Sequence, residues 1–174
     1  MILERARTFR LVDKGGAGLA CDERPLVMKF EISPLEGVGD VKFGLFREDV
    51  RRMAGLECSS FKRSPQATLP CDYFERLGTF FYYDSTDRLE ALEFVKPARP
   101  TIYALELLGE SFDAACVRLR ALDSNLEVEG DGAIARQLGV SVYAPLAEDD
   151  PGAAIESVLA FAPGYYEDWS ASAR

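Results

Sequence analysis

The architecture of this chain follows from one stretch, Gly44-Leu-Phe-Arg-Glu-Asp-Val-Arg-Arg-Met-Ala-Gly55. Its apolar residues stand at positions i, i+4, i+7 and i+8, so they lie on one face of a helix. They are Phe46, Val50, Met53 and Ala54. Acidic residues come early in the stretch, arginines come late and a glycine ends it, which is the order that a helix favours. We therefore predict a helix from Phe46 to Ala54.

The same succession of segments occurs a second time. Two strand-like segments follow the first helix, Leu77-Gly-Thr-Phe-Phe-Tyr-Tyr-Asp84 and Leu89-Glu-Ala-Leu-Glu-Phe-Val95. Their counterparts later in the chain are Gly109-Glu-Ser-Phe-Asp-Ala-Ala-Cys-Val-Arg-Leu-Arg-Ala121, Leu138-Gly-Val-Ser-Val-Tyr-Ala-Pro145 and Ile155-Glu-Ser-Val-Leu-Ala-Phe161. The three offsets are 65, 61 and 67 residues. A nearly constant offset predicts a duplicated unit of one helix followed by strands.

We therefore predict an α+β fold in which two pseudo-repeats of a helix and antiparallel strands form one continuous curved sheet. Residues 1–174 form a single domain, with halves at about 35–97 and 101–165 and an N-terminal strand segment at 1–34. This segment includes a predicted strand at Thr8–Val12.

Several segments are predicted to be loops or turns between the helices and strands. Residues 56–72 are polar and rich in serine and proline, which predicts an exposed loop. Prolines at 97–100 predict a joint between the halves. Ile134–Leu138 predicts a short helical turn, and Glu148–Gly152 an acidic loop.

The composition favours a water-soluble domain with its own core. The chain has 174 residues, of which 48% are hydrophobic, enough to bury a sizeable core. It contains no run of about 18 apolar residues, so no membrane span is predicted. The first residues lack the apolar segment of a secretory signal, and we expect a cytoplasmic protein that has no membrane partner.

The charge is acidic and unevenly distributed. The net charge is −9, and residues 101–174 carry 4 basic and 13 acidic residues. Such a surface repels nucleic acid, because phosphate binding needs clustered lysine and arginine. It attracts a basic protein and speeds the encounter with it. The alternative interpretation is that the charge serves solubility alone.

The sequence lacks the residue patterns of the common catalytic and metal-binding sites. The chain has no histidine, which excludes Ser-His-Asp and Cys-His catalysis. The segment Glu127–Gly132 resembles the start of a calcium loop, but position twelve is Leu138 instead of a bidentate glutamate. The cysteines lack the spacing of zinc ligands and are predicted to be small buried residues: Cys21, Cys58, Cys71 and Cys116. We predict no enzyme, no metal and no cofactor.

The candidate site is a protein-binding surface of acidic and aromatic residues. The acidic residues, which would meet a basic partner, are Glu127, Glu129, Asp131, Glu148, Asp149 and Asp150. Tyr82 and Tyr143 are the predicted exposed aromatic anchors.

The chain resembles known families at two motifs. Phe43-Gly-Leu-Phe-Arg-Glu-Asp-Val50, followed by Gly55, resembles the Gly-Met-Thr-x-x-Glu-Val helix starts of small outer-membrane assembly lipoproteins and of β-lactamase inhibitor proteins. Leu77-Gly78, with an aromatic strand, a hairpin and a second strand after it, is similar to bacterial immunity proteins of polymorphic or contact-dependent toxin systems. The resemblance spans about residues 35–165, and Leu45 and Phe46 replace Met and Thr.

The resemblance implies a role as well as a fold. It implies tandem repeats and tight binding that blocks another protein, here an immunity or inhibitor protein against a toxin domain. No functional residue of those families transfers to this chain, because immunity proteins use divergent contact surfaces. Two alternatives stay open: a non-catalytic structural or accessory domain of a secretion or envelope system, and a small-molecule binder.

Overall fold

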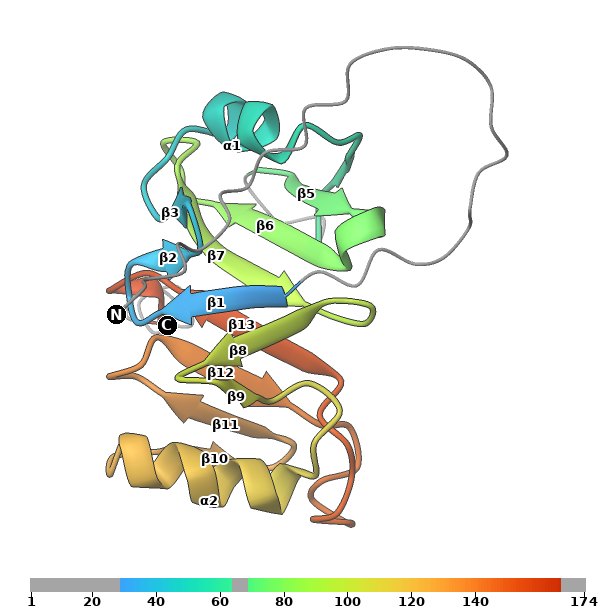
Figure 1. Ribbon diagram of the computed structural model, residues 1–174, viewed down its shortest axis with the longest axis vertical. Helices are drawn as coiled ribbons and strands as arrows, with labels where there is room; N and C mark the ends of the chain where they lie inside the picture. The colour runs from blue at the N-terminus through green and yellow to red at the C-terminus, as the bar shows by residue number, and fades with distance from the viewer. Residues whose placement is uncertain (1–28, 64–68, 167–174) are drawn as a thin grey trace, which may run out of the picture.

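The computed structural model describes residues 29–63 and 69–166. Within them the chain forms two α-helices and thirteen strands in two sheets, which is the predicted α+β class (Figure 1). The predicted strand at Thr8–Val12 lies outside the described residues. Neither described helix is long and apolar enough to cross a membrane.

The larger sheet has eight strands and is antiparallel throughout. In spatial order its strands are β10 (Glu127–Glu129), β11 (Gly132–Ala135), β12 (Val140–Tyr143), β13 (Ser157–Phe161), β7 (Leu89–Phe94), β6 (Thr79–Tyr83), β5 (Cys71–Phe74) and β4 (Ser59–Phe61). The two halves meet where β13 pairs with β7. The sheet is therefore continuous across both halves.

A second sheet of five strands was not predicted. Its strands are β3 (Val41–Lys42), β2 (Gly37–Val38), β1 (Lys29–Ser33), β8 (Arg99–Ile102) and β9 (Leu105–Glu106). β1 and β8 pair in parallel although 70 residues separate Phe30 from its partner Pro100. The predicted joint at 97–100 is therefore wrong in part. A proline fits here because the ladder between β8 and β9 begins only at Thr101.

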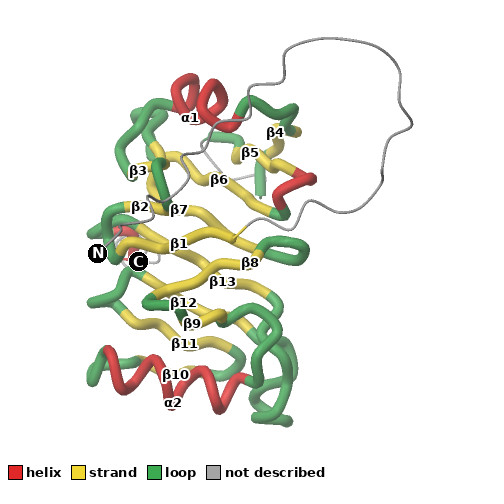
Figure 2. The backbone as a smooth tube through the Cα atoms, in the orientation of Figure 1, coloured by secondary structure: helices red, strands yellow, loops and turns green. Residues whose placement is uncertain are grey.

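One face of the eight-stranded sheet is covered by three elements side by side. They are α1 (Arg47–Ala54) at one end, the five-stranded sheet in the middle and α2 (Phe112–Leu122) at the other end (Figures 1 and 2). Phe30 of β1 packs on Phe94 of β7, with ring centroids 5.2 Å apart. Val50 of α1 and Leu119 of α2 are fully buried in the same core.

Strongly periodic segments were predicted well, and short strands were not. Both helices and the strands β6, β7, β12 and β13 are confirmed. The loop predicted at 56–72 is wrong at both ends, because it contains β4 and the start of β5. The turn predicted at Ile134–Leu138 is wrong at its first two residues, which belong to β11, and a turn follows from Arg136 onward. The short 3₁₀-helix η1 (Glu75–Leu77) precedes β6.

The two halves make corresponding backbone hydrogen bonds. The Gly44 N–H donates to the Leu89 carbonyl, and the Gly109 N–H donates to the Ile155 carbonyl, with an N···O distance of 2.8 Å in each case. In both halves the bond ties the loop before the helix to the start of the last strand. A duplication of the sequence itself stays a prediction.

Candidate functional site

The other face of the eight-stranded sheet is covered by neither helix and not by the five-stranded sheet. Strand register aligns one row of side chains across it: Tyr73, Phe80, Glu93, Leu159, Ser141, Ile134 and Glu127. Glu129 and Tyr143 stand beside this row on β10 and β12. We call these nine residues the open face. Among the described residues, Tyr165 and Tyr166 pack near it, against Phe161.

Aromatic rings fill the β4–β6 end of this face. Phe80 stacks on Tyr73 with ring centroids 4.2 Å apart, and Phe61 meets Phe80 edge-on at 6.1 Å. Such pairs add to the energy of area burial alone. Aromatic residues therefore lie on both faces of β6, with Phe81 and Tyr83 in the core and Phe80 on the open face.

Tyr82 is not an exposed anchor, which corrects the sequence prediction. Its side chain is only 5% exposed, and the Arg63 guanidinium lies over its ring, 3.9 Å from the centroid. The Tyr82 hydroxyl donates a hydrogen bond to Glu93. Burial, together with this hydrogen bond, raises the pKa of Tyr82 well above its usual range. Tyr82 therefore positions Glu93 and is not available to a partner.

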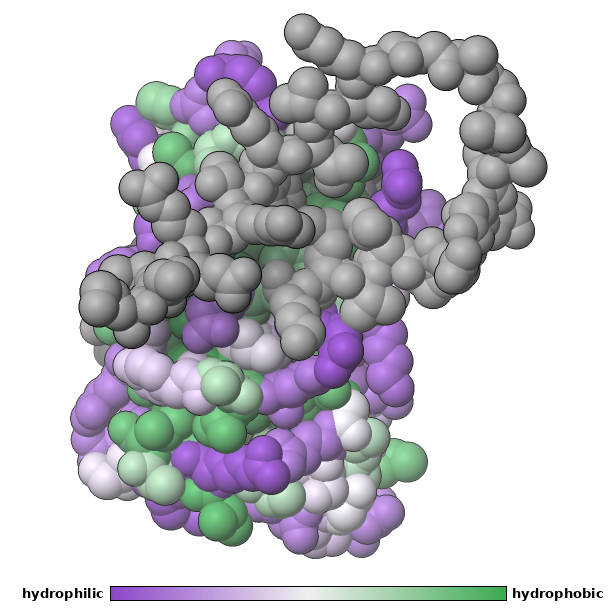
Figure 3. All heavy atoms as spheres, viewed as in Figure 1, coloured by the Kyte–Doolittle hydropathy of each residue, from purple (hydrophilic) through white to green (hydrophobic). Residues whose placement is uncertain are grey.

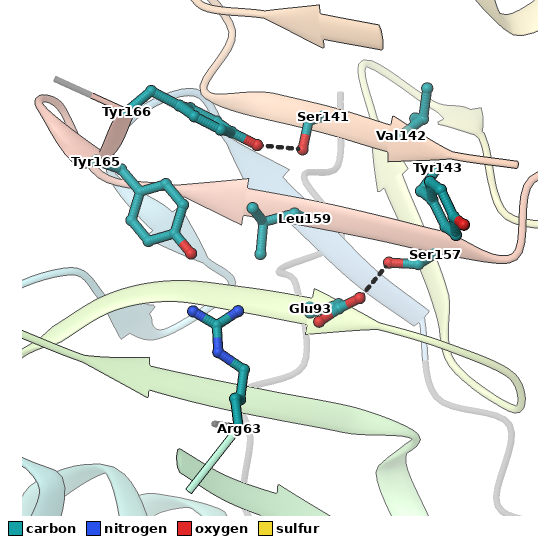
Figure 4. A pocket seen from close by; sticks show the side chains of 9 residues that line it. All are labelled: Arg63, Glu93, Ser141, Val142, Tyr143, Ser157, Leu159, Tyr165 and Tyr166. Carbon is teal, nitrogen blue, oxygen red and sulfur yellow. Dashed lines mark hydrogen bonds between the residues drawn. The ribbon is translucent and has the colours of Figure 1, made fainter. Parts of the chain in front are cut away.

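Glu93 lies at the centre of the open face, where the two halves join. The Ser157 hydroxyl donates to its Oε1 at 2.5 Å, and the Tyr82 hydroxyl donates to its Oε2. Glu93 lines a cavity of about 240 Å³. Figure 4 shows Arg63 and the rings of Tyr165 and Tyr143 around this carboxylate. The two hydroxyl donors hold this carboxylate in a fixed orientation.

A second cavity of about 310 Å³ adjoins the first, and Ser141, Val142, Tyr143 and Tyr166 line both. Its other walls include Glu127 and Glu129 of β10. Glu127 accepts two hydrogen bonds from Arg136, at 2.7 and 3.0 Å, which hold the pKa of its carboxyl below the usual range. Tyr143 is 49% exposed. The structure thus brings together three of the predicted residues, Glu127, Glu129 and Tyr143.

The remaining predicted acidic residues lie beyond the β10–β11 turn. The Asp131 carboxylate accepts a hydrogen bond of 3.0 Å from the Glu148 N–H, so Asp131 anchors the acidic loop. Glu148, Asp149 and Asp150 are exposed there, and Asp150 also accepts a hydrogen bond from Gly152 within the loop. The structure thus places all six acidic residues at the β10–β11 end of the molecule, away from Tyr82.

Sequence reasoning overlooked the centre of the site. The sequence alone assigned no role to Glu93, Arg63 or Ser157. The only local signal was a pair of acidic residues, Glu90 and Glu93, within the otherwise apolar segment Leu89–Phe94. Ser157 is 64 residues from Glu93 in sequence, so only the fold reveals the contact.

The open face combines several kinds of polar and aromatic group. It offers carboxylates, hydroxyls and aromatic faces. In residues 29–63 and 69–166 no three acidic or cysteine residues are grouped to hold a metal ion. Cys71 and Cys116 are buried, Cys58 is half-buried, and burial raises the pKa of all three free thiols. Cys21 lies outside the described residues.

The opposite side of the molecule has a different surface. Figure 3 views it from the side of the five-stranded sheet and shows hydrophilic residues interspersed with small apolar groups around α2. Its exposed apolar residues include Val117 on α2 and Tyr103 between β8 and β9.

Comparisons with known proteins leave the family open. No family model matches the chain, and no curated protein and no solved structure matches it.

Proposed function

We propose that this protein is a cytoplasmic immunity or inhibitor protein that binds a toxin domain through the open face and blocks it. The observation that carries the proposal is the open face itself, where the half-exposed Tyr143 stands between two cavities lined by carboxylates. Tyrosine is enriched among the residues that dominate binding energy at interfaces.

The dimensions of the open face suit a protein partner. Eight strands spaced by about 4.8 Å make the sheet roughly 34 Å wide. A standard interface buries about 800 Å² on each partner, which a face of this width can supply in large part. The two cavities are shallow parts of this wider surface, so side chains of a partner can enter them.

The charge favours a basic partner. Among the described residues, three carboxylates line the two cavities, and Arg63 lines the first of them only. The acidic loop at 148–150 extends the negative surface beyond the end of β10. A basic toxin domain, such as a nuclease, is complementary to such a surface.

The test begins with a partner encoded beside this protein. The chain is co-expressed with each neighbouring gene product, and the complex is purified at high salt. We expect one product to bind stoichiometrically, to inhibit growth when expressed alone, and to lose that toxicity in the presence of this chain. If no neighbouring product binds, the immunity function is wrong.

Two exposed tyrosines give a matched pair of variants for the open face. Tyr143 is 49% exposed on this face, and Tyr103 is 58% exposed on the other sheet. We expect Tyr143→Ala to weaken partner binding at least about 10-fold, since interface anchors contribute about 2 kcal/mol, and Tyr103→Ala to change it less than about 2-fold. Titration calorimetry measures both. Equal effects would show that the partner binds elsewhere.

A small-molecule binder is the second candidate, because the two cavities adjoin. A thermal-shift screen with metabolites tests it. A metabolite that raises the melting temperature of the wild-type chain and loses this effect on Glu93→Gln would favour this function over the immunity role.

A further inference from the structure

The floor of the second cavity is formed by a glycine. Gly132 on β11 pairs with Glu129 on β10 and with Tyr143 on β12. Side chains of paired residues stand on the same face of a sheet. Gly132 has none, so a notch opens between the Glu129 carboxylate and the Tyr143 ring. The two flanking Cα atoms are about 10 Å apart, as two strand spacings require.

The two walls of this notch are available to a ligand. Tyr143 is half-exposed. Within the described part of the chain, the Glu129 side chain has no hydrogen-bond or ion-pair partner, whereas Glu127 next to it is held by Arg136. The cavity of about 310 Å³ lies over the notch, and all of its charged lining residues are acidic. Its chemistry therefore selects a cation with a flat face.

We propose that this notch receives an arginine side chain of the protein partner, with its guanidinium stacked on Tyr143 and hydrogen-bonded to Glu129. The inference rests on the proposed function, because it names the group that the partner presents. A guanidinium is planar, donates two parallel hydrogen bonds to a carboxylate and stacks on aromatic rings. An ammonium group gains only the charge interaction and is more strongly hydrated.

Gly132 offers a substitution that fills the notch without straining the backbone. A Cβ at this position would lie 3.7 Å from the Glu129 carbonyl oxygen and 3.8 Å from the Val142 carbonyl oxygen, which are ordinary contacts. β-Branched residues also suit a strand. Gly132→Val therefore keeps the fold and occupies the space of the guanidinium.

The probe is N-acetyl-L-arginine amide, compared with the lysine and norleucine amides, and backbone amide shifts in NMR spectra are the readout. We expect saturable shifts centred on Gly132 and Tyr143, with a dissociation constant on the order of 1 mM. The lysine amide binds at least about 3-fold more weakly. Gly132→Val and Glu129→Gln each weaken arginine binding at least about 5-fold, since each removes about 1 kcal/mol. Asp149→Asn, which changes an exposed acid outside the notch, leaves binding within about 2-fold.

Two results would overturn the inference. One is a norleucine amide that shifts the same signals as strongly as the arginine amide. The other is unchanged arginine binding to Gly132→Val and Glu129→Gln. If Gly132→Val loses its native spectrum, Gly132→Ala takes its place.

Binding of the whole partner separates this inference from the proposed function. A partner that binds Gly132→Val and Glu129→Gln as tightly as wild type refutes the arginine notch and leaves the immunity role intact. Arginine-amide binding at the notch without any protein partner supports the guanidinium site and refutes the immunity role.

Discussion

Asp72 is the most densely bonded charged residue that the structure describes. Its side chain is 0% exposed and accepts hydrogen bonds from Arg47, Arg51, Ser60 and Tyr83, at 2.6 to 3.1 Å. Burial of this carboxyl group opposes its ionisation. The hydrogen bonds from Arg51 and Ser60 and the charges of both arginines outweigh burial and lower the pKa of Asp72. The cluster fixes α1 to β4, β5 and β6.

We expect Asp72→Asn to lower the free energy of unfolding by about 3 kcal/mol at pH 7, because it leaves the buried Arg47 with only part of its charge compensation. Chemical denaturation measures this change. Asp49→Asn is the control, since it breaks an ion pair with Arg52 that lies near the surface of α1 and should cost less than about 0.5 kcal/mol. Equal costs would show that the cluster contributes no more than a surface pair.

The same variant has a defined pH dependence. The pKa of Asp72 is lower in the folded state than in the unfolded chain, so its carboxylate stabilises the fold fully above the unfolded pKa of about 3.9. This contribution is lost as the pH falls through the folded pKa. The stability difference between wild type and Asp72→Asn should therefore be constant from pH 6 to 8 and shrink below about pH 4. A difference that grows on acidification would contradict the assigned ionisation.

Two glycines directly before strands lie where a side chain would not fit. Gly78 has a φ of 61°, and a Cβ there would lie 2.4 Å from the Val95 carbonyl oxygen at the end of β7. Gly139 enters β12 in the same conformation, with the Phe161 carbonyl oxygen 2.7 Å from an added Cβ. In each half, the chain enters a strand tightly against the end of the half's last strand.

Gly78→Ala should therefore cost about 3 kcal/mol of unfolding free energy, since both left-handed strain and a backbone clash result. Gly55 after α1 has the same φ of 61°, but no atom lies within 4 Å of its added Cβ. Gly55→Ala should cost only about 1 kcal/mol, the strain alone. Thermal unfolding of both variants separates the two contributions. If the costs are equal, the close approach at Val95 relaxes without loss.

The elements that sequence reasoning found are those that local pattern specifies. Both helices repeat apolar residues every three or four positions, and β6 and β7 are rich in apolar and aromatic residues. The strands it missed have either a distant partner or no local pattern. β8 exists because it pairs with β1 about 70 residues earlier, and β4 has three exposed residues with no alternation. No window of the sequence contains that information.

The residues of the candidate site also divide into those that the sequence predicts correctly and those that it does not. Tyr143 is exposed as the alternation along β12 predicts, whereas all three residues of β10 are exposed. The structure brings Tyr143 together with Glu127 and Glu129 of β10. The prediction that Tyr82 is exposed was wrong because Arg63, from the loop after β4, lies over its ring. The alternation along a strand thus indicates on which face of the sheet a side chain lies. It does not indicate whether another segment of the chain covers that side chain.

At the scale of the molecule, a cluster of exposed acidic residues lies at the β10 end of the described structure. The net charge is −9, and Glu148, Asp149 and Asp150 are exposed beyond the β10–β11 turn. A field of this kind speeds the approach of a basic partner while the charges lie within a Debye length, which is about 10 Å at 0.1 M salt. The acidic loop should therefore affect association more than dissociation.

We expect the triple variant Glu148→Ala, Asp149→Ala and Asp150→Ala to lower the association rate with the partner about 5-fold at 20 mM salt, because steering changes on-rates. The control triple Glu36→Ala, Glu48→Ala and Glu57→Ala removes the same charge from exposed positions in the first half and should change the rate less than about 2-fold. Stopped-flow kinetics across 20 to 500 mM salt measures both. At 500 mM the two triples and the wild type should converge, since the Debye length is then shorter than the gap between approaching surfaces. If both triples slow association equally at low salt, net charge and not the acidic loop directs the encounter.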